Sequence, residues 1–221
     1  MSDFSLSSIG DGVPDDADDS DADGQRIGTA VRVVGALLAS LWAVEIADAI
    51  PFTPDLQANG IRPRETAGLD GILWAPFLHS DWWHLIANSA PFAILGGLVA
   101  VRGLRYWLTT TLVVAGLGGL LTWLLAGSGN HIGASGVVFG YFGALIGAAV
   151  FERRIAAGAT AMVAIMLYGG LISGFLPRPG ISWEGHLFGA VAGLVAARFL
   201  AEPRVDNRLP DPPLDDPYWE V

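Results

Sequence analysis

The sequence contains neither cysteine nor lysine, and charged residues of any kind are few. The lack of cysteine excludes a disulfide framework and thiol chemistry. Only 15% of the 221 residues are charged, whereas 52% are hydrophobic and the mean hydropathy is +0.48. A soluble domain would be less apolar, and its apolar residues would be distributed periodically rather than in blocks. The composition therefore predicts an integral membrane protein.

The acidic residues lie largely in the two terminal segments. Fourteen of the 22 acidic residues fall within the first 25 residues or after residue 201, in stretches rich in Pro, Ser, Gly and Asp. Such stretches bury too little apolar surface to fold. We therefore expect disordered acidic tails over residues 1–26 and 202–221, on either side of a membrane domain over residues 27–201. The net charge of −10 argues against a nucleic-acid partner.

Long apolar blocks define the expected architecture. A membrane-spanning helix needs about 17–25 predominantly apolar residues. Blocks of this length occur at residues 28–50, 84–101, 106–127, 132–151, 155–176 and 185–201. They predict an all-α polytopic membrane protein built as a bundle of six transmembrane helices. The segment before the first block is acidic rather than basic, which argues against a secretory signal peptide, so we expect this block to be retained as a helix.

The arginines predict the orientation of the bundle in the membrane. With six spans, nine of the twelve arginines lie on the same side as the two tails, and three lie on the opposite side. The positive-inside rule then places both termini in the cytoplasm, and we expect the protein in the plasma membrane of a prokaryote. The second, fourth and sixth helices consequently begin at the outer face and run inward.

Polar side chains gather where these three helices begin. The four histidines of the chain all lie within a few residues of such a helix start: His79, His84, His131 and His186. His84 and Asn88 are four residues apart and share one face of the second helix. Ser135 lies less than one turn inside the fourth helix, and His186 opens the sixth. Three antiparallel hairpins thus bring a serine, two histidines and an asparagine to one depth of the membrane.

Each of these residues also has a simpler interpretation. Serine in a transmembrane helix is mostly a packing residue, asparagine can bond a neighbouring helix, and an interface histidine can be a solvated cap. A histidine-rich metal site is a further alternative, but the nearby acids Asp81 and Glu184 lie in loops, and we expect no metal. What weakens the simpler interpretations is that the four residues coincide at one depth.

Glycines at regular spacing predict which helices meet. Pairs four residues apart occur in the fourth and sixth blocks: Gly136 and Gly140, Gly143 and Gly147, and Gly189 and Gly193. Small residues at this spacing let two helix backbones approach closely. If these faces meet, the Ser135 hydroxyl and the His186 imidazole come within hydrogen-bond reach, which is the geometry that activates a nucleophile.

Three motifs resemble those of the rhomboid intramembrane serine proteases. Gly133-Ala134-Ser135-Gly136 is similar to the GxSG motif of that family. The other two matches are the HxxGxxxG helix, with His186, Gly189 and Gly193, and the HxxxN helix, with His84 and Asn88. The likeness extends over residues 28–201, with the motifs on the corresponding helices of a six-span bundle.

The resemblance implies a function and a set of roles. It implies a serine endopeptidase without a cofactor that cleaves single-span transmembrane proteins in the lipid bilayer near the outer face. Ser135 and His186 would form a catalytic dyad with no third acidic member, and His84, Asn88 and the backbone N–H of Ser135 would bind the oxyanion. Phe139 falls where many family members carry a tyrosine that packs on the catalytic histidine.

Two other classes of function fit the sequence less well. A family member that binds transmembrane clients without cleaving them would be expected to lack the serine or the histidine, yet both are present. A transporter or channel would place charged residues near the bilayer midplane, and the middles of the second to sixth blocks have none. The sequence assigns no role to His79, to His131 or to the tails, and it does not define the substrate or the oligomeric state.

Overall fold

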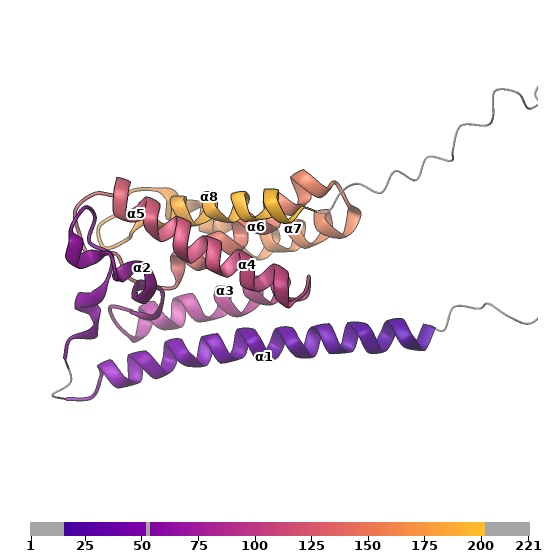
Figure 1. The fold of residues 1–221 in the computed structure, drawn as a ribbon, viewed down its shortest axis with the longest axis horizontal. Coiled ribbons are helices and arrows are strands. Elements are labelled where there is room, and N and C mark those ends of the chain that lie inside the picture. Colours follow the sequence, from indigo (N-terminus) through magenta and orange to yellow (C-terminus); the bar gives the residue numbers. More distant parts are fainter. Residues whose placement is uncertain (1–15, 52–53, 202–221) are drawn as a thin grey trace, which may run out of the picture.

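The computed structural model describes residues 16–51 and 54–201, and their regular structure is almost entirely helical. The α-helices are α1 (Asp16–Asp48), α2 (Gly71–Trp74), α3 (Trp82–Ala100), α4 (Leu104–Val113), α5 (Gly119–Leu125), α6 (Ser135–Glu152), α7 (Ile155–Tyr168) and α8 (Trp183–Leu200). Shorter turns are η1 (Leu56–Asn59), η2 (Thr66–Gly68), η3 (Ala75–Phe77), the π-helical η4 (Val114–Gly118) and η5 (Gly169–Phe175). Within the described ranges the only β-pairing consists of two isolated bridges, Ile61 with His131 and Arg178 with Ile181. The all-α prediction is confirmed (Figure 1).

The predicted membrane-spanning character is also confirmed. By length and hydropathy, however, five rather than six helices among the described residues qualify as membrane spans. Five helical segments in the described part of the chain are long and apolar enough to cross a bilayer: Gly24–Asp48, Trp82–Ala100, Leu104–Leu125, Ser135–Glu152 and Ile155–Phe175. The sixth expected block lies in α8, which has 18 residues, as many as α6. Glu184 and His186 in its first turn and Arg198 in its last lower the hydropathy of α8.

The expected boundary of the N-terminal tail differs from the structure. α1 begins at Asp16, so residues 16–26 belong to a helix rather than to a disordered segment. Once a helix is nucleated, adding a residue to its end is far easier than starting a new helix, so α1 can continue upstream of the apolar block. The remaining tail segments, residues 1–15 and 202–221, lie outside the described residues, as do residues 52–53.

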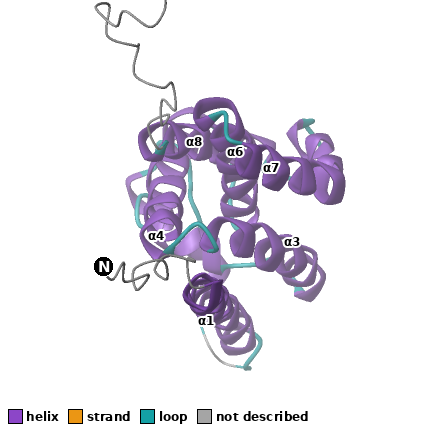
Figure 2. Cartoon of the chain, turned by 90° about the vertical axis from the view of Figure 1, so that its right-hand side faces the viewer, coloured by secondary structure: helices purple, strands orange, loops and turns teal. Residues whose placement is uncertain are grey.

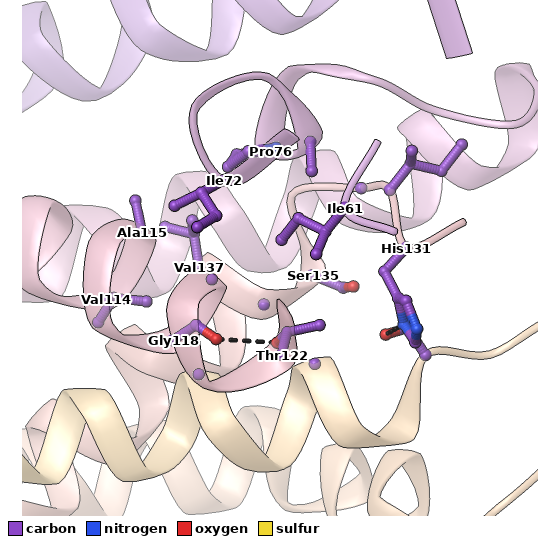
Figure 3. Close-up of a pocket in the computed structure, with 18 residues that line it drawn as sticks. Ile61, Ile72, Pro76, Val114, Ala115, Gly118, Thr122, His131, Ser135 and Val137 are labelled. Carbon is purple, nitrogen blue, oxygen red and sulfur yellow. Dashed lines mark hydrogen bonds between the residues drawn. The ribbon is translucent and has the colours of Figure 1, made fainter. Parts of the chain in front are cut away.

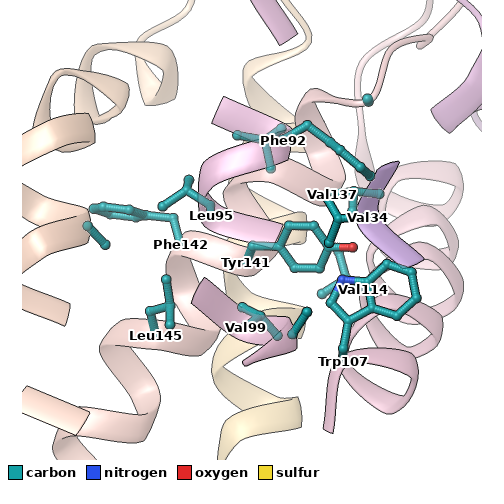
Figure 4. Packing of buried hydrophobic residues seen from close by; sticks show 14 of the residues in the cluster. Val34, Phe92, Leu95, Val99, Trp107, Val114, Val137, Tyr141, Phe142 and Leu145 are labelled. Atoms are coloured by element: carbon teal, nitrogen blue, oxygen red, sulfur yellow. The ribbon is translucent and has the colours of Figure 1, made fainter. Parts of the chain in front are cut away.

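α6 forms the centre of the bundle. About two thirds of its span, 67%, is buried inside the protein. Tyr141, fully buried at the middle of α6, contacts the ring of Phe92 from α3, and its hydroxyl lies 2.9 Å from Thr111 Oγ1 of α4 (Figure 4). Viewed along the bundle, α6 lies beside α8, whereas α1 lies at the edge beside α3 (Figure 2).

Glycines allow α6 and α8 to pack backbone against backbone. A Cβ atom added at Gly189 would collide with the carbonyl of Gly136, and one added at Gly193 would collide with the carbonyl of Gly140. On α6, a Cβ at Gly143 would in turn collide with the carbonyl of Ala190. The glycine faces predicted from the sequence therefore lie against each other, and the first turns of α6 and α8 are neighbours.

Candidate active site

The backbone before Ser135 is held in a conformation that requires glycine. Gly133 has φ +114°, a region that L residues with a side chain rarely adopt. Its N–H donates to the carbonyl of Ala75 at 2.9 Å, and the N–H of Ala134 donates to Nε2 of His79 at 3.3 Å. The chain then enters α6 at Ser135. A Cβ at Gly133 would lie 2.8 Å from Nε2 of His84, so the glycine also provides the space for that ring.

Ser135 and His186 are in direct contact. Nε2 of His186 lies 2.9 Å from Oγ of Ser135, and Nδ1 lies 2.8 Å from the carbonyl oxygen of Gly174. Because a carbonyl oxygen can only accept, Nδ1 carries the proton in the neutral ring, and Nε2 is left to accept from the serine hydroxyl. This is the tautomer that a general base needs.

Aromatic packing fixes the plane of the His186 ring. The ring of Phe139 stacks on it with centroids 4.1 Å apart and an interplanar angle of 7°. Phe175 packs edge-on against Phe139 at 5.0 Å. A Cβ at Gly174 would lie 2.6 Å from Cζ of Phe139 and 3.1 Å from Nδ1 of His186, so this position also requires glycine. Gly174 and Phe175 were not predicted from the sequence, although the glycines near the end of the fifth apolar block were a usable signal.

His84 and Asn88 lie at the start of α3. The Asp81 carboxylate caps this helix by accepting from the backbone N–H of His84 at 2.9 Å. That hydrogen bond, followed by one from Ser80, holds the pKa of Asp81 below its usual value. Nδ1 of His84 lies 3.2 Å from Oγ of Ser80, and Nδ2 of Asn88 donates to the carbonyl of His84 at 3.0 Å. An amide NH₂ has two hydrogens, so one remains for a ligand.

Ser135 lines two cavities. The larger has a volume of about 830 Å³, and its walls include Ser135, His186, His84 and Asn88. The smaller, about 50 Å³, is lined mainly by apolar and glycine residues (Figure 3). Ser135 and His131 lie on one side of it, and Val114 and Ala115 lie on the other. Ser135 thus borders both a cavity large enough for a peptide segment and a pocket that fits only a small group.

His79 lies next to the site and contacts two of the segments that form it. Its side chain is only 1% exposed, and its ring packs edge-on against His84 with centroids 5.1 Å apart. Burial, followed by the charge of His84, lowers the pKa of His79 to about 4. The neutral ring can therefore accept from the N–H of Ala134 at ordinary pH. The gathering of all four histidines at helix starts was the sequence signal, but the contacts of this one could not be inferred from it.

The histidines of the site were also considered as metal ligands. Among residues 16–51 and 54–201, no group of three or more His, Cys, Asp or Glu side chains is close enough to hold a metal ion. The histidines instead contact serine hydroxyls, backbone groups and aromatic rings.

The fold and the site are those of a polytopic membrane protein that holds a serine–histidine pair at a cavity near one end of its helices. The chain belongs to the rhomboid family: the family model for the Rhomboid domain matches residues 68–203. Membership of this family implies intramembrane protease activity.

The relatives are bacterial and plant proteins. The chain is 41% identical over 176 residues to an uncharacterized protein of Mycobacterium tuberculosis, an alignment that covers 75% of this chain and 73% of the relative. An uncharacterized protein of Mycobacterium leprae is 39% identical over 181 residues, covering 77% and 71%. RHOMBOID-like protein 5 of Arabidopsis thaliana is 30% identical over 155 residues, covering 65% of this chain and 48% of the plant protein.

Proposed function

We propose that this protein is an intramembrane serine endopeptidase in which Ser135 is the nucleophile and His186 the general base. The observation that carries the proposal is the 2.9 Å contact between Oγ of Ser135 and Nε2 of His186, with Nδ1 directed to the carbonyl of Gly174. A nucleophile, an acceptor nitrogen and a group that orients the imidazole are the parts that nucleophilic catalysis requires.

The reaction follows from these contacts. Oγ of Ser135 attacks the scissile carbonyl carbon while Nε2 of His186 takes the hydroxyl proton, and the imidazolium formed keeps its Nδ1–H on Gly174. The same proton then passes to the leaving amine as the peptide C–N bond breaks, which leaves an acyl-enzyme. Water, deprotonated by His186, attacks the acyl carbon, and the returning proton restores the serine hydroxyl.

The negative charge that develops on the carbonyl oxygen needs hydrogen-bond donors. The side chains of His84 and Asn88 line the same cavity as Ser135 and are the proposed donors. The backbone N–H of Ser135 is the third, because the first N–H groups of a helix have no partner within it. Donors of this kind contribute mostly to the transition state, where the charge appears.

The proposed substrates are single-span membrane proteins. A transmembrane segment must leave its helical form to place a peptide bond at Ser135, so segments with helix breakers or small residues near the outer face should be preferred. The small pocket of about 50 Å³ beside Ser135 favours a small side chain at the cleaved bond. With nine arginines on the tail side and three opposite, we further propose cytoplasmic termini in the plasma membrane of a prokaryote.

A mechanism-based serine hydrolase probe tests the assignment. The purified full-length protein should react covalently with a fluorophosphonate, and Ser135→Ala should abolish the reaction. The wild type, but not Ser135→Ala, should also cleave members of a panel of tagged single-span proteins in proteoliposomes. Labelling that persists in Ser135→Ala would mean that another residue is the nucleophile.

A further inference from the structure

His131 connects three parts of the chain just before the nucleophile. Four residues upstream of Ser135, it pairs with Ile61 through both of its backbone groups: the N–H of Ile61 donates to the carbonyl of His131 at 3.0 Å, and the reverse bond measures 2.9 Å. This bridge ties the approach to α6 to the segment before α2. Neither the sequence motifs nor the proposed mechanism assigns His131 a role.

The side chain of His131 reaches two further elements. Its Nε2 lies 3.1 Å from the carbonyl oxygen of Gly127, just after α5, and its Nδ1 lies 2.6 Å from Oγ of Ser182, just before α8. The carbonyl can only accept, so Nε2 carries the proton in the neutral ring. Nδ1 then accepts from the hydroxyl of Ser182.

Ser182 occupies an unusual position for a serine. It is the N-cap residue of α8, yet its side chain makes no capping hydrogen bond. A serine at this position normally accepts from the N–H groups of the first turn. Here its hydroxyl is directed to His131, while its backbone carbonyl accepts from the N–H of His186 at 3.1 Å. One residue thus links the His131 ring to the turn that carries the base.

A second contact joins the same two segments. Oε1 of Glu184 accepts from the N–H of Gly127 at 3.2 Å. The loop between α5 and α6 is therefore attached to the first turn of α8 at two points, through His131 and through Glu184.

We propose that the His131–Ser182 pair is a positioning contact that sets the distance between Ser135 and His186. The glycine contacts between α6 and α8 begin at Gly136 and Gly189 and continue away from the site, on the inner side of the dyad. The His131–Ser182 hydrogen bond lies on the outer side, so the two sets of contacts bracket the catalytic pair. This inference rests on the proposed function. His131 does not touch the reacting atoms and acts through the elements that hold them.

The test uses full-length protein and measures the rate of fluorophosphonate labelling at Ser135 together with kcat and KM for a cleaved single-span substrate. Because even ~1 Å of displacement can cost on the order of a hundredfold in rate, Ser182→Ala and His131→Phe should each lower labelling and kcat by roughly tenfold or more. KM should change little. The double variant should be no slower than the slower single variant, and Ser182→Thr, which keeps the hydroxyl, should regain most of the rate.

Ser40→Ala on α1 is the matched control, because that hydroxyl bonds only the carbonyl of Leu37 in its own helix. It should behave as wild type. Losses that multiply in the double variant, or a raised KM with unchanged kcat, would show that the two residues do not act as a positioning pair. If His131→Phe fails to fold, Ser182→Ala, which removes a single hydroxyl, carries the test.

Hydrogen exchange tests the same contact independently of catalysis. Amides 183–187, including the His186 N–H bonded to Ser182, should exchange faster in Ser182→Ala and His131→Phe than in wild type or Ser40→Ala. Unchanged exchange in both variants would overturn the positioning contact. A wild type that is neither labelled nor active would overturn the proposed protease function, and the exchange result would still decide the contact.

Discussion

In the proposed mechanism, the two hydrogen bonds of His186 take the place of an acidic third member. In a serine–histidine–aspartate triad a carboxylate holds the imidazole in the required tautomer. Here the carbonyl of Gly174 performs the orienting part, and the stacked ring of Phe139 fixes the plane. The ring of Phe139 stacks on His186 without a hydroxyl, at the position where the resemblance leads us to expect a tyrosine in many family members.

Asn88 is the residue at which a catalytic and a structural role can be separated most clearly. Its amide bonds only the carbonyl of His84 in its own helix, so Asn88→Ala should lower thermal stability only slightly. As an oxyanion donor, its loss should reduce kcat by about 10²–10³. KM should change little, because the interaction forms only in the transition state. Steady-state kinetics and a melting curve on the same preparation check this. Normal turnover combined with a much lower Tm would make Asn88 a packing residue.

His79 should make the stability of the protein depend on pH. Its pKa of about 4 in the folded state lies below the ordinary value of 6.5, so the unfolded state binds more protons between these values. Stability should therefore fall as pH drops from 6.5 to 4, by up to about 3 kcal/mol. His84 and Asp81 are the charged neighbours of His79. They titrate both in the wild type and in the variant described next, so the comparison isolates His79.

Replacement of His79 by glutamine isolates this effect. Glutamine can still accept from the N–H of Ala134 but does not gain a proton. His79→Gln should show a flatter dependence of Tm on pH between 7 and 4 than wild type, measured by thermal denaturation in detergent. Parallel curves for the two proteins would mean that His79 is not the group responsible.

At the scale of the elements, the site depends on how closely α6 and α8 approach. A Cβ at Gly189 would meet the backbone of Gly136 one residue beyond Ser135, and backbone cannot move aside as the end of a side chain can. Gly189→Ala should therefore push the helices apart, cost about 1–3 kcal/mol of stability, and reduce kcat through the longer Ser135–His186 distance. Thermal melting and probe labelling measure the two effects.

Gly97→Ala on α3 is the control for this change. A Cβ there would meet nothing within 4 Å. Since alanine suits a helix better than glycine, this variant should be at least as stable as wild type and equally active. A Gly189→Ala protein that melts and cleaves like Gly97→Ala would refute the close-approach argument.

At the scale of the whole molecule, the proposed catalytic groups are concentrated at one end of the bundle. Ser135, His84 and His186 lie in the first turns of α6, α3 and α8, the end that the segments α2 and η1–η3 cover (Figure 1). At the other end, the buried carboxylate of Glu152 pairs with the guanidinium of Arg102, which also packs on the ring of Tyr106. The two ends therefore differ in chemistry, as expected if they face different compartments.

The proposed orientation can be tested with single cysteines, because the chain has none of its own. Ala58 lies on the side of the site and Ala156 on the side of the tails, and both are exposed. In intact cells, an impermeant thiol reagent should label Ala58→Cys but not Ala156→Cys, and permeabilised cells should show labelling of both. The reverse pattern would place the termini outside.

Several features of this protein follow from the sequence because they depend on local composition and spacing. The apolar blocks predict helices long enough to span a membrane, and five of them are present as such. The three motifs predict the family, which the match over residues 68–203 confirms. The start of α1 was predicted less well, because acidic residues are compatible both with a disordered tail and with a helix N-terminus.

The contact between Ser135 and His186 was predicted from the glycine spacing, but only the tertiary structure decided several other contacts between polar groups. The proton on His186 is placed by the carbonyl of Gly174, from a different element, and no spacing within the sequence predicts that contact. The same holds for His79 with Ala134 and for His131 with Ser182, pairs separated by 55 and 51 residues. The composition of the long apolar helices indicates that they can cross a membrane. The helices that each of them packs against were determined by close contact between surfaces that are distant in the sequence. Glycines contribute to this contact because they have no side chain and let two backbones approach closely.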